Sequence, residues 1–186
     1  MLYFYEKMKE ITLHEKTFVQ CLTAEYLASI VDGVALKMNL ELSDKEPIFI
    51  SILNGSFMFT SDLMKRLEFP CYITFVKMNS YTGTESSGNI TTCIGLTENI
   101  ENRTVVIVED IIDTGATVTY FIEEIKKLNP KDVKIASMFF KPATCKHDIK
   151  IDYLGTEIPN DFVVGYGLDY NGLGRNFREL YKLKEL

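Results

Sequence analysis

The chain has 186 residues, 46% of them hydrophobic and 25% charged, which suits one soluble domain with a buried core. Its formal net charge of -6 disfavours a protein that wraps a nucleic acid, because a phosphate backbone attracts positive surface. The sequence contains no run of about 18 apolar residues, so no membrane span is predicted. The N-terminus lacks the pattern of a signal peptide and the four cysteines form no CxxC pair, so we expect a cytoplasmic protein with reduced thiols.

The first half of the chain alternates between helical and strand patterns. Residues 17–38 carry apolar side chains at helical spacing and predict an amphipathic helix. The apolar run at 48–53 predicts a strand buried on both faces, as in a parallel sheet. An Asn-Gly-Ser turn follows at 54–56, and a second helix is expected over 57–67.

The middle of the chain predicts two strands around a polar loop. Residues 72–78 are typical of a strand, and residues 90–96 are typical of a returning strand. Between them, residues 79–89 have no hydrophobic period and contain two glycines, which predicts a mobile loop.

The second half repeats the alternation and indicates the fold class. A buried strand is expected at 104–110, followed by a helix, and further strands at 133–140, 151–155 and 162–168. Such alternation predicts an α/β fold with a central, mostly parallel sheet flanked by helices. Because ligands bind beyond the carboxyl ends of parallel strands, the loops at 54–56, 110–117 and 141 should share one face.

Residues 105–117, VVIVEDIIDTGAT, carry the most specific chemical pattern. An apolar strand delivers Glu109 and Asp110 to its end, and the segment Asp113-Thr114-Gly115-Ala116-Thr117 then opens a helix. A helix start offers unpaired amides and the positive end of the macrodipole, and glycine lets the backbone approach a ligand closely. The pattern predicts a cradle for one phosphate beside two carboxylates that can accept hydrogen bonds from sugar hydroxyls.

Simpler interpretations of this segment remain open when its parts are taken singly. Asp113 or Thr114 alone is more often a helix cap, and an acidic pair at a strand end is often solvated. The sequence has no GxxxxGK[ST] loop and no GxGxxG after a strand, which excludes the usual triphosphate and dinucleotide sites. The joined run therefore favours a sugar phosphate.

With these residues in place, the sequence resembles the type I phosphoribosyltransferases, and within them the members that act on hypoxanthine and guanine. The resemblance covers roughly residues 12–178 and rests on segments in the family's order: LNGSFMF at 53–59, NSY at 79–81, VEDIIDTGAT at 108–117, FKPAT at 140–144 and PNDFVVGYGLDYNGLGR at 159–175. It implies a single domain over residues 1–186, with a small hood formed by the N-terminal region and residues from about 151 to 186.

The resemblance implies roles for the residues of the central motif. Glu109 and Asp110 would hold the ribose 2′ and 3′ hydroxyls, and residues 113–117 would bind the 5′-phosphate. Asp113 would lie near N7 of the purine as general base or acid. Lys141 would donate to O6, which favours 6-oxopurines over adenine because lysine has donors only.

Further roles implied by the resemblance concern the base and the leaving group. Phe162 would stack on the base and Val163 would offer backbone groups to its edge. Asp169, with the acidic pair Glu109 and Asp110, would help to hold Mg²⁺, a hard cation that prefers oxygen ligands. Arg175 would contact pyrophosphate.

Two loops complete the implied site. Leu53, Asn54, Gly55 and Ser56 resemble the family's pyrophosphate loop, in which several members place lysine where Asn54 stands, so only the backbone is expected to bind there. The pair Ser80-Tyr81 matches the family's catalytic loop, whose closure excludes water from the reacting centre.

The implied reaction joins a 6-oxopurine to phosphoribosyl pyrophosphate and releases pyrophosphate, with Mg²⁺ as cofactor, in a homodimer or homotetramer. Two alternatives stay open: a phosphoribosyltransferase for another base, and a non-catalytic nucleotide-sensing regulator of the same fold. The intact Asp113 and the acidic balance of the chain disfavour the regulator, since a regulator that binds nucleic acid usually needs a basic face.

Overall fold

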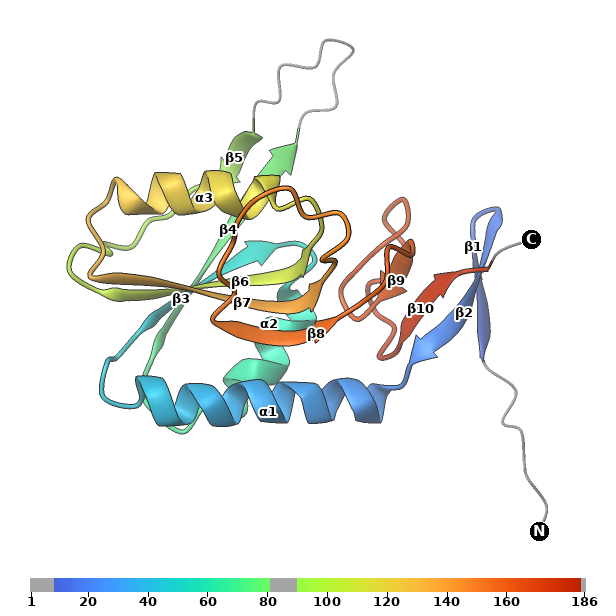
Figure 1. The fold of residues 1–186 in the computed structure, drawn as a ribbon, viewed down its shortest axis with the longest axis horizontal. Helices are drawn as coiled ribbons and strands as arrows, with labels where there is room; N and C mark the ends of the chain where they lie inside the picture. Colours follow the sequence, from blue (N-terminus) through green and yellow to red (C-terminus); the bar gives the residue numbers. More distant parts are fainter. Residues whose placement is uncertain (1–8, 81–89, 185–186) are drawn as a thin grey trace.

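A computed structural model describes residues 9–80 and 90–184 of the chain. Within these ranges the chain alternates mainly between strands and helices (Figure 1). The elements in order are β1 (Glu10–Leu13), β2 (Lys16–Leu22), α1 (Ala24–Leu42), β3 (Ile48–Leu53), α2 (Phe57–Met64), β4 (Tyr72–Ser80), β5 (Ile90–Ile94), β6 (Thr104–Ile112), α3 (Ala116–Lys126), β7 (Asp132–Phe140), β8 (Tyr153–Glu157), β9 (Val163–Gly165) and β10 (Leu180–Leu183).

The main sheet has six strands in the order β5-β4-β3-β6-β7-β8. All neighbours pair in parallel except β5, which runs antiparallel to β4 at one edge. The expected α/β class with a mostly parallel sheet is therefore confirmed. Ile50 pairs with Ile107, and Ile107 with Ile135, so the carboxyl ends of β3, β6 and β7 lie at the same edge.

The two faces of the main sheet have separate hydrophobic cores. Phe49 of β3 joins the core under α1 and α2, whereas its neighbours Ile48 and Ile50 join the core under α3. Figure 1 shows α3 on one face and α1 with α2 on the other. Strand β3 is buried on both faces because its side chains alternate between these two cores, as its continuous apolar pattern predicted.

A second, smaller sheet has the order β1-β2-β10-β9, with antiparallel pairing throughout. We call this sheet, together with Phe162 and the turns at 166–179 between β9 and β10, the hood. In Figure 1 it lies beside the main sheet, at the end where α1 begins. The expected hood boundary near residue 151 is corrected by β8, which pairs in parallel with β7 and belongs to the main sheet. The C-terminal strands of the hood are β9 and β10.

The helix expected over 17–38 is wrong in its first turns. Residues 16–22 form β2, which pairs with β1 on one side and β10 on the other, and Phe18 fills the core of the hood. The helix begins after Thr23, whose hydroxyl accepts a hydrogen bond from the Tyr26 amide at 3.2 Å. Strand pairing with segments far along the chain outweighs the helical spacing of the apolar residues here.

The strand expected over 162–168 is shorter than predicted. β9 ends at Gly165, and the chain then turns through Tyr166 and Gly167 at positive φ. The other expected helices and strands occur at their predicted places to within a few residues. No helix among residues 9–80 and 90–184 is long and apolar enough to cross a membrane.

Two glycines offer a matched test of this packing. A Cβ on Gly155 of β8 would lie 2.4 Å from the Met138 carbonyl oxygen, whereas a Cβ on Gly33 of α1 would meet nothing within 4 Å. We expect Gly155→Ala to lower the free energy of unfolding by about 1–3 kcal/mol, since the backbone must shift. Gly33→Ala should raise it by about 0.5–1 kcal/mol, because alanine favours the helix. Urea unfolding measures both, and equal effects of the two variants would contradict this account of the packing.

Candidate active site

The carboxyl ends of β3, β6 and β7 open into one cavity of about 350 Å³, which residues of the hood line on its other side. The loops after these strands therefore do share one face. Most of the residues singled out from the sequence line this cavity: Leu53, Asn54, Gly55, Glu109, Asp110, Asp113, Thr117, Lys141, Phe162, Val163, Asp169 and Arg175.

A smaller hollow of about 90 Å³ lies at the N-terminus of α3 and shares Glu109, Asp113 and Thr117 with the main cavity. Gly115 adopts a φ of 85° at the helix N-cap, and a Cβ there would lie 2.6 Å from Ile149 Cδ1. The Thr114 hydroxyl accepts a long hydrogen bond of 3.4 Å from the amide of Ala116. Helix amides and hydroxyls around a small hollow are suited to one phosphate group.

Glu109 and Asp110, the acidic pair at the end of β6, are buried where the charged form of a carboxyl group is disfavoured. Burial, with the neighbouring Asp110, raises the pKa of Glu109 well above its ordinary value. Burial also raises the pKa of Asp110 to about 6, although the Ile111 amide and Arg175 act in the opposite direction. Glu109 Oε2 is buried and has no hydrogen-bond partner within the described chain. The site therefore presents a buried oxygen that a hydroxyl group of a ligand can satisfy.

Asp113 is fixed by two partners, one on each carboxylate oxygen. Lys141 Nζ donates to Oδ2 at 3.0 Å, and the Thr144 hydroxyl donates to Oδ1 at 2.5 Å. Partial burial acts to raise the pKa of Asp113, but the hydrogen bonds from Thr144 and Lys141 outweigh it and the pKa is lowered. Asp113 is thus an ionised carboxylate that can accept a proton.

The hood contributes a charged pair and an exposed aromatic ring. Asp169 Oδ1 lies 2.5 Å from Arg175 Nη2, and Asp169 Oδ2 accepts a hydrogen bond of 2.7 Å from the Gly172 amide. Phe162 keeps 47% of its surface exposed while Tyr170 packs edge-on against it, with 5.8 Å between ring centroids. An exposed ring on a cavity wall, held from the side, offers a face on which a planar ligand can stack.

Comparison with known proteins assigns the chain to a family. A family model for the phosphoribosyl transferase domain matches residues 20–171. A hypoxanthine-guanine phosphoribosyltransferase of Staphylococcus aureus is 38% identical over 164 residues, which is 88% of this chain and 92% of the relative. The chain belongs to the phosphoribosyltransferase family.

Solved structures agree with this assignment. A hypoxanthine phosphoribosyltransferase from Staphylococcus aureus superposes with a TM-score of 0.84 at 37% identity, covering 89% of this chain and 90% of that one. A mutant hypoxanthine phosphoribosyltransferase from Trypanosoma cruzi, in its ternary substrates complex, has a TM-score of 0.83 at 30% identity and covers 97% of both chains.

Two of the described residues predicted for the site of this phosphoribosyltransferase, Ser56 and Ala116, lie outside the linings of the cavity and of the hollow. Ser56 is buried, and its hydroxyl donates to the Ile52 carbonyl oxygen at 2.5 Å, so only its backbone can reach a ligand. Ala116 lies on the first turn of α3, beside the hollow. Ser80 is the last residue of β4, and Tyr81 lies outside the described residues.

The phosphoribosyltransferase site also contains residues that the sequence did not single out. Thr144 holds Asp113, and its only signal was its place in the FKPAT segment. Met78 of β4 and Leu168 of the hood add apolar surface to the cavity. Apolar residues of this kind are indistinguishable from core residues in a sequence.

The described residues of this phosphoribosyltransferase do not form a metal site by themselves. The side chains that the structure describes, at 9–78 and 95–184, include no group of three or more His, Cys, Asp or Glu arranged to hold a metal ion. Glu109, Asp110 and Asp169 line the same cavity but do not converge into such a group, and Asp169 is already paired with Arg175. A Mg²⁺ ion at these residues would need oxygen ligands from water and substrate.

The unsatisfied Glu109 makes stability depend on pH in a predictable direction. The folded phosphoribosyltransferase binds the Glu109 proton more tightly than the unfolded chain, whose glutamate pKa is about 4.3. The free energy of unfolding should therefore fall as the pH rises above that value. In Glu109→Gln it should fall less, so that the variant is more stable than the wild type by on the order of 1 kcal/mol at about pH 8.

Urea unfolding between about pH 5 and about pH 8 measures this difference. The exposed Glu101 supplies the control, because Glu101→Gln should leave the pH dependence as it is in the wild type. Parallel curves for Glu109→Gln and the wild type would show that Glu109 carries no unfavourable buried charge.

Proposed function

We propose that this enzyme transfers the 5-phosphoribosyl group from phosphoribosyl pyrophosphate to hypoxanthine or guanine, giving IMP or GMP and pyrophosphate, a reaction of purine salvage. The observation that carries the proposal is one cavity that combines the acidic pair Glu109 and Asp110, the α3 N-terminus and the pair of Lys141 with Asp113. These groups match a sugar, a phosphate and a 6-oxopurine, respectively. The similarity to hypoxanthine-guanine phosphoribosyltransferases supports the same substrates.

The ribose phosphate would occupy the region between β6 and α3. The carboxylates of Glu109 and Asp110 accept hydrogen bonds from the ribose 2′ and 3′ hydroxyls, and these bonds satisfy the unpaired Glu109 Oε2. The 5′-phosphate binds the amides and hydroxyls of residues 113–117 at the α3 N-terminus. Because both the ribose hydroxyls and the 5′-phosphate are held, C1′ is oriented toward the base.

The 6-oxopurine would lie against the hood. Phe162 offers the stacking face, and the backbone of Val163 offers hydrogen-bonding groups to the edge of the base. Lys141 donates one hydrogen bond to Asp113 and retains two further N–H groups for the O6 atom. Adenine presents an amino group at this position, which would face the ammonium of Lys141 as a second donor.

The chemical step would form the N9–C1′ bond as the bond from C1′ to the pyrophosphate oxygen breaks. The base must lose one proton, and the ionised Asp113 accepts it from N7. Thr144 and Lys141 hold the two carboxylate oxygens of Asp113 during this transfer. The N7 proton therefore has a fixed acceptor, and the negative charge of the Asp113 carboxylate neutralises it.

Pyrophosphate would leave past the loop after β3 and the hood. Backbone groups of Leu53, Asn54 and Gly55 line its path, with Ser56 next along the loop and Arg175 as the nearby cation. Arg175 is oriented by Asp169 and by the Gly167 carbonyl oxygen, to which it donates at 2.7 Å. Ser80 and Tyr81 would exclude water from C1′.

Magnesium would enter with the substrate. Glu109, Asp110 and Asp169 supply carboxylate oxygens along one wall of the cavity, while phosphate oxygens and water complete the coordination. When bound, the ion neutralises the charge of the leaving pyrophosphate. The chelator EDTA should therefore abolish turnover, and added Mg²⁺ should restore it.

We also propose a cytoplasmic homodimer or homotetramer. Cys21, Cys71 and Cys145 are free thiols, as suits a reducing compartment. Ile73 and Phe75 of β4 are each 41% exposed and offer apolar surface for a second copy. Sedimentation equilibrium of the purified chain tests the oligomeric state.

The deciding assay follows pyrophosphate release with phosphoribosyl pyrophosphate and Mg²⁺, offering hypoxanthine, guanine, xanthine and adenine separately. We expect turnover with hypoxanthine or guanine and little with adenine. Turnover with another base alone would replace the proposed substrate. Binding of phosphoribosyl pyrophosphate without turnover of any base would favour a non-catalytic regulator.

Removing the negative charge of Asp113 should separate chemistry from binding. In Asp113→Asn we expect kcat to fall by about 10²- to 10⁴-fold, because the N7 proton loses its acceptor. The Kd of phosphoribosyl pyrophosphate, measured by calorimetry, should change by less than about threefold. The exposed Asp148 gives a control variant, Asp148→Asn, with wild-type turnover. An unchanged kcat in Asp113→Asn would remove Asp113 from the proton transfer.

Removing the ammonium of Lys141 should weaken the choice of base. In Lys141→Ala we expect the ratio of kcat/KM for hypoxanthine to that for adenine to fall at least about tenfold, since the donor to O6 is lost. Lys131→Ala, on the exposed surface, should keep the wild-type ratio. If the ratio in Lys141→Ala equals that of the wild type, the selectivity lies elsewhere in the cavity.

A further inference from the structure

The turn after β9 has an unusual backbone for its place in the cavity wall. Gly165, Tyr166 and Gly167 follow one another at φ values of 97°, 47° and 98°. Glycine adopts such values readily, but a tyrosine does so only where its surroundings hold it there. The turn lies between Val163 and Arg175, both of which line the cavity.

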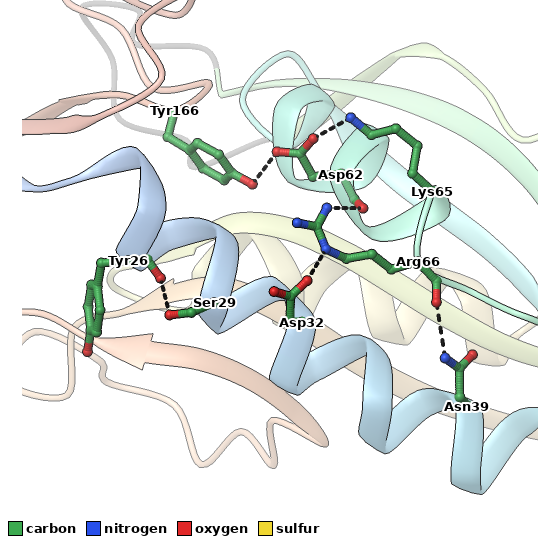
Figure 2. A network of polar contacts seen from close by, with 8 residues as sticks. All are labelled: Tyr26, Ser29, Asp32, Asn39, Asp62, Lys65, Arg66 and Tyr166. Atoms are coloured by element: carbon green, nitrogen blue, oxygen red, sulfur yellow. Dashed lines mark hydrogen bonds and ion pairs between the residues drawn. The ribbon is translucent and has the colours of Figure 1, made fainter.

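Tyr166 is held by contacts with helix α2 and with strand β7 of the main sheet. Its side chain is buried, its hydroxyl donates to Asp62 Oδ2 at 2.8 Å, and its ring packs edge-on against Phe139 at 6.4 Å between centroids. Figure 2 shows the phenol pointing at Asp62 of α2. This hydrogen bond joins residues 104 positions apart and attaches the hood to α2, which packs on the main sheet.

Asp62 is itself fixed from several sides. Its Oδ1 accepts a hydrogen bond from Lys65 at 2.6 Å, and its backbone carbonyl oxygen accepts one from Arg66 Nη1 at 2.9 Å. Arg66 continues the network to Asp32 of α1, as Figure 2 shows. The acceptor of the Tyr166 hydroxyl is therefore anchored to two helices.

One residue beyond Tyr166, the backbone contacts the loop proposed to bind pyrophosphate. A Cβ on Gly167 would lie 2.0 Å from the Gly55 carbonyl oxygen, so the two backbones touch. The Gly167 carbonyl oxygen accepts a hydrogen bond from Arg175 at 2.7 Å, and the Gly167 amide donates to the Arg175 carbonyl oxygen at 3.0 Å. The position of the Gly167 backbone therefore constrains the positions of both Gly55 and Arg175.

We propose that Tyr166 is a positioning residue: its hydrogen bond to Asp62 fixes the turn at Gly167 against Gly55 and Arg175, and so shapes the pyrophosphate side of the cavity. This inference rests on the proposed function, because it assigns the affected side of the cavity to the leaving group. Tyr166 acts through the backbone and need not touch the substrate.

A second tyrosine supplies a matched control. The Tyr153 hydroxyl donates to Glu41 Oε2 at 3.0 Å, and Tyr153 is likewise buried. This pair joins β8 to α1 and does not line the cavity. Tyr166→Phe and Tyr153→Phe therefore each remove one hydrogen bond from a phenol to a carboxylate, but only the first lies behind the site.

The test compares the two variants in kinetics with hypoxanthine and Mg²⁺. We expect Tyr166→Phe to raise the KM for phosphoribosyl pyrophosphate about tenfold, equivalent to ~1.4 kcal/mol, with kcat within about twofold. Tyr153→Phe should leave both KM and kcat unchanged. The two variants should lower the thermal midpoint by similar amounts, because each loses one buried hydrogen bond. Equal effects of the two variants on KM, or an unchanged KM in Tyr166→Phe, would overturn the proposal.

Variants of Asp62 test the partner of the hydrogen bond. Asp62→Asn retains an oxygen that accepts from Tyr166 and should keep the KM within about threefold of the wild type, whereas Asp62→Leu should reproduce the KM of Tyr166→Phe. A wild-type KM in Asp62→Leu would contradict the proposal.

Amide hydrogen exchange at residues 165–168 gives a readout without substrate. Exchange should be faster in Tyr166→Phe than in the wild type and unchanged in Tyr153→Phe. Equal exchange in all three proteins would overturn the positioning role, whereas a wild-type enzyme inactive with every base would instead refute the proposed function.

Discussion

Two adjacent carboxylates at the end of a buried strand are the constraint on which this structure depends. Glu109 and Asp110 stand where the main sheet meets the hood, with raised pKa values and with Glu109 Oε2 unpaired in the described chain. A buried acceptor without a partner lowers stability, so a fold selected for stability alone would not keep it. A ligand whose hydroxyl groups complete these hydrogen bonds explains why the unpaired oxygen is present despite this loss of stability.

The main sheet and the hood form one site because their backbones meet without side chains between them. A Cβ on Gly55 would lie 1.3 Å from Asp110 Oδ2, and a Cβ on Gly167 would lie 2.0 Å from the Gly55 carbonyl oxygen. Gly55 is therefore enclosed between a carboxylate of the sheet and the turn of the hood. Any larger residue at either glycine would separate the two halves of the cavity.

Recognition of the base and transfer of its proton share one pair of residues. Lys141 and Asp113 are 28 positions apart in the chain, yet the end of β7 and the start of the loop before α3 bring them to 3.0 Å. Thr144 completes the arrangement by occupying the second oxygen of Asp113. A change at Lys141 therefore alters both the selectivity for a 6-oxo group and the environment of the proton acceptor.

Local sequence determined most of the secondary structure and the central motif. The apolar runs of β3, β6 and β7, the acidic pair and the Asp-Thr-Gly helix start are patterns of neighbouring residues, so strand, loop and helix could be predicted along with the edge where a ligand binds. The resemblance to phosphoribosyltransferases rested on the central motif and on further segments from LNGSFMF at 53–59 to PNDFVVGYGLDYNGLGR at 159–175, and the comparisons confirm it.

Tertiary structure alone decided the features that join distant segments. Residues 17–22 have helical spacing but form β2, because β1 and β10 supply strand partners that no local pattern shows. Ser56 turns its hydroxyl into the core, Thr144 reaches Asp113, and Tyr166 reaches Asp62 across 104 positions. Periodicity reports only which face of an element is buried, whereas the partner met by a polar group depends on how the elements pack, and packing is a property of the whole chain.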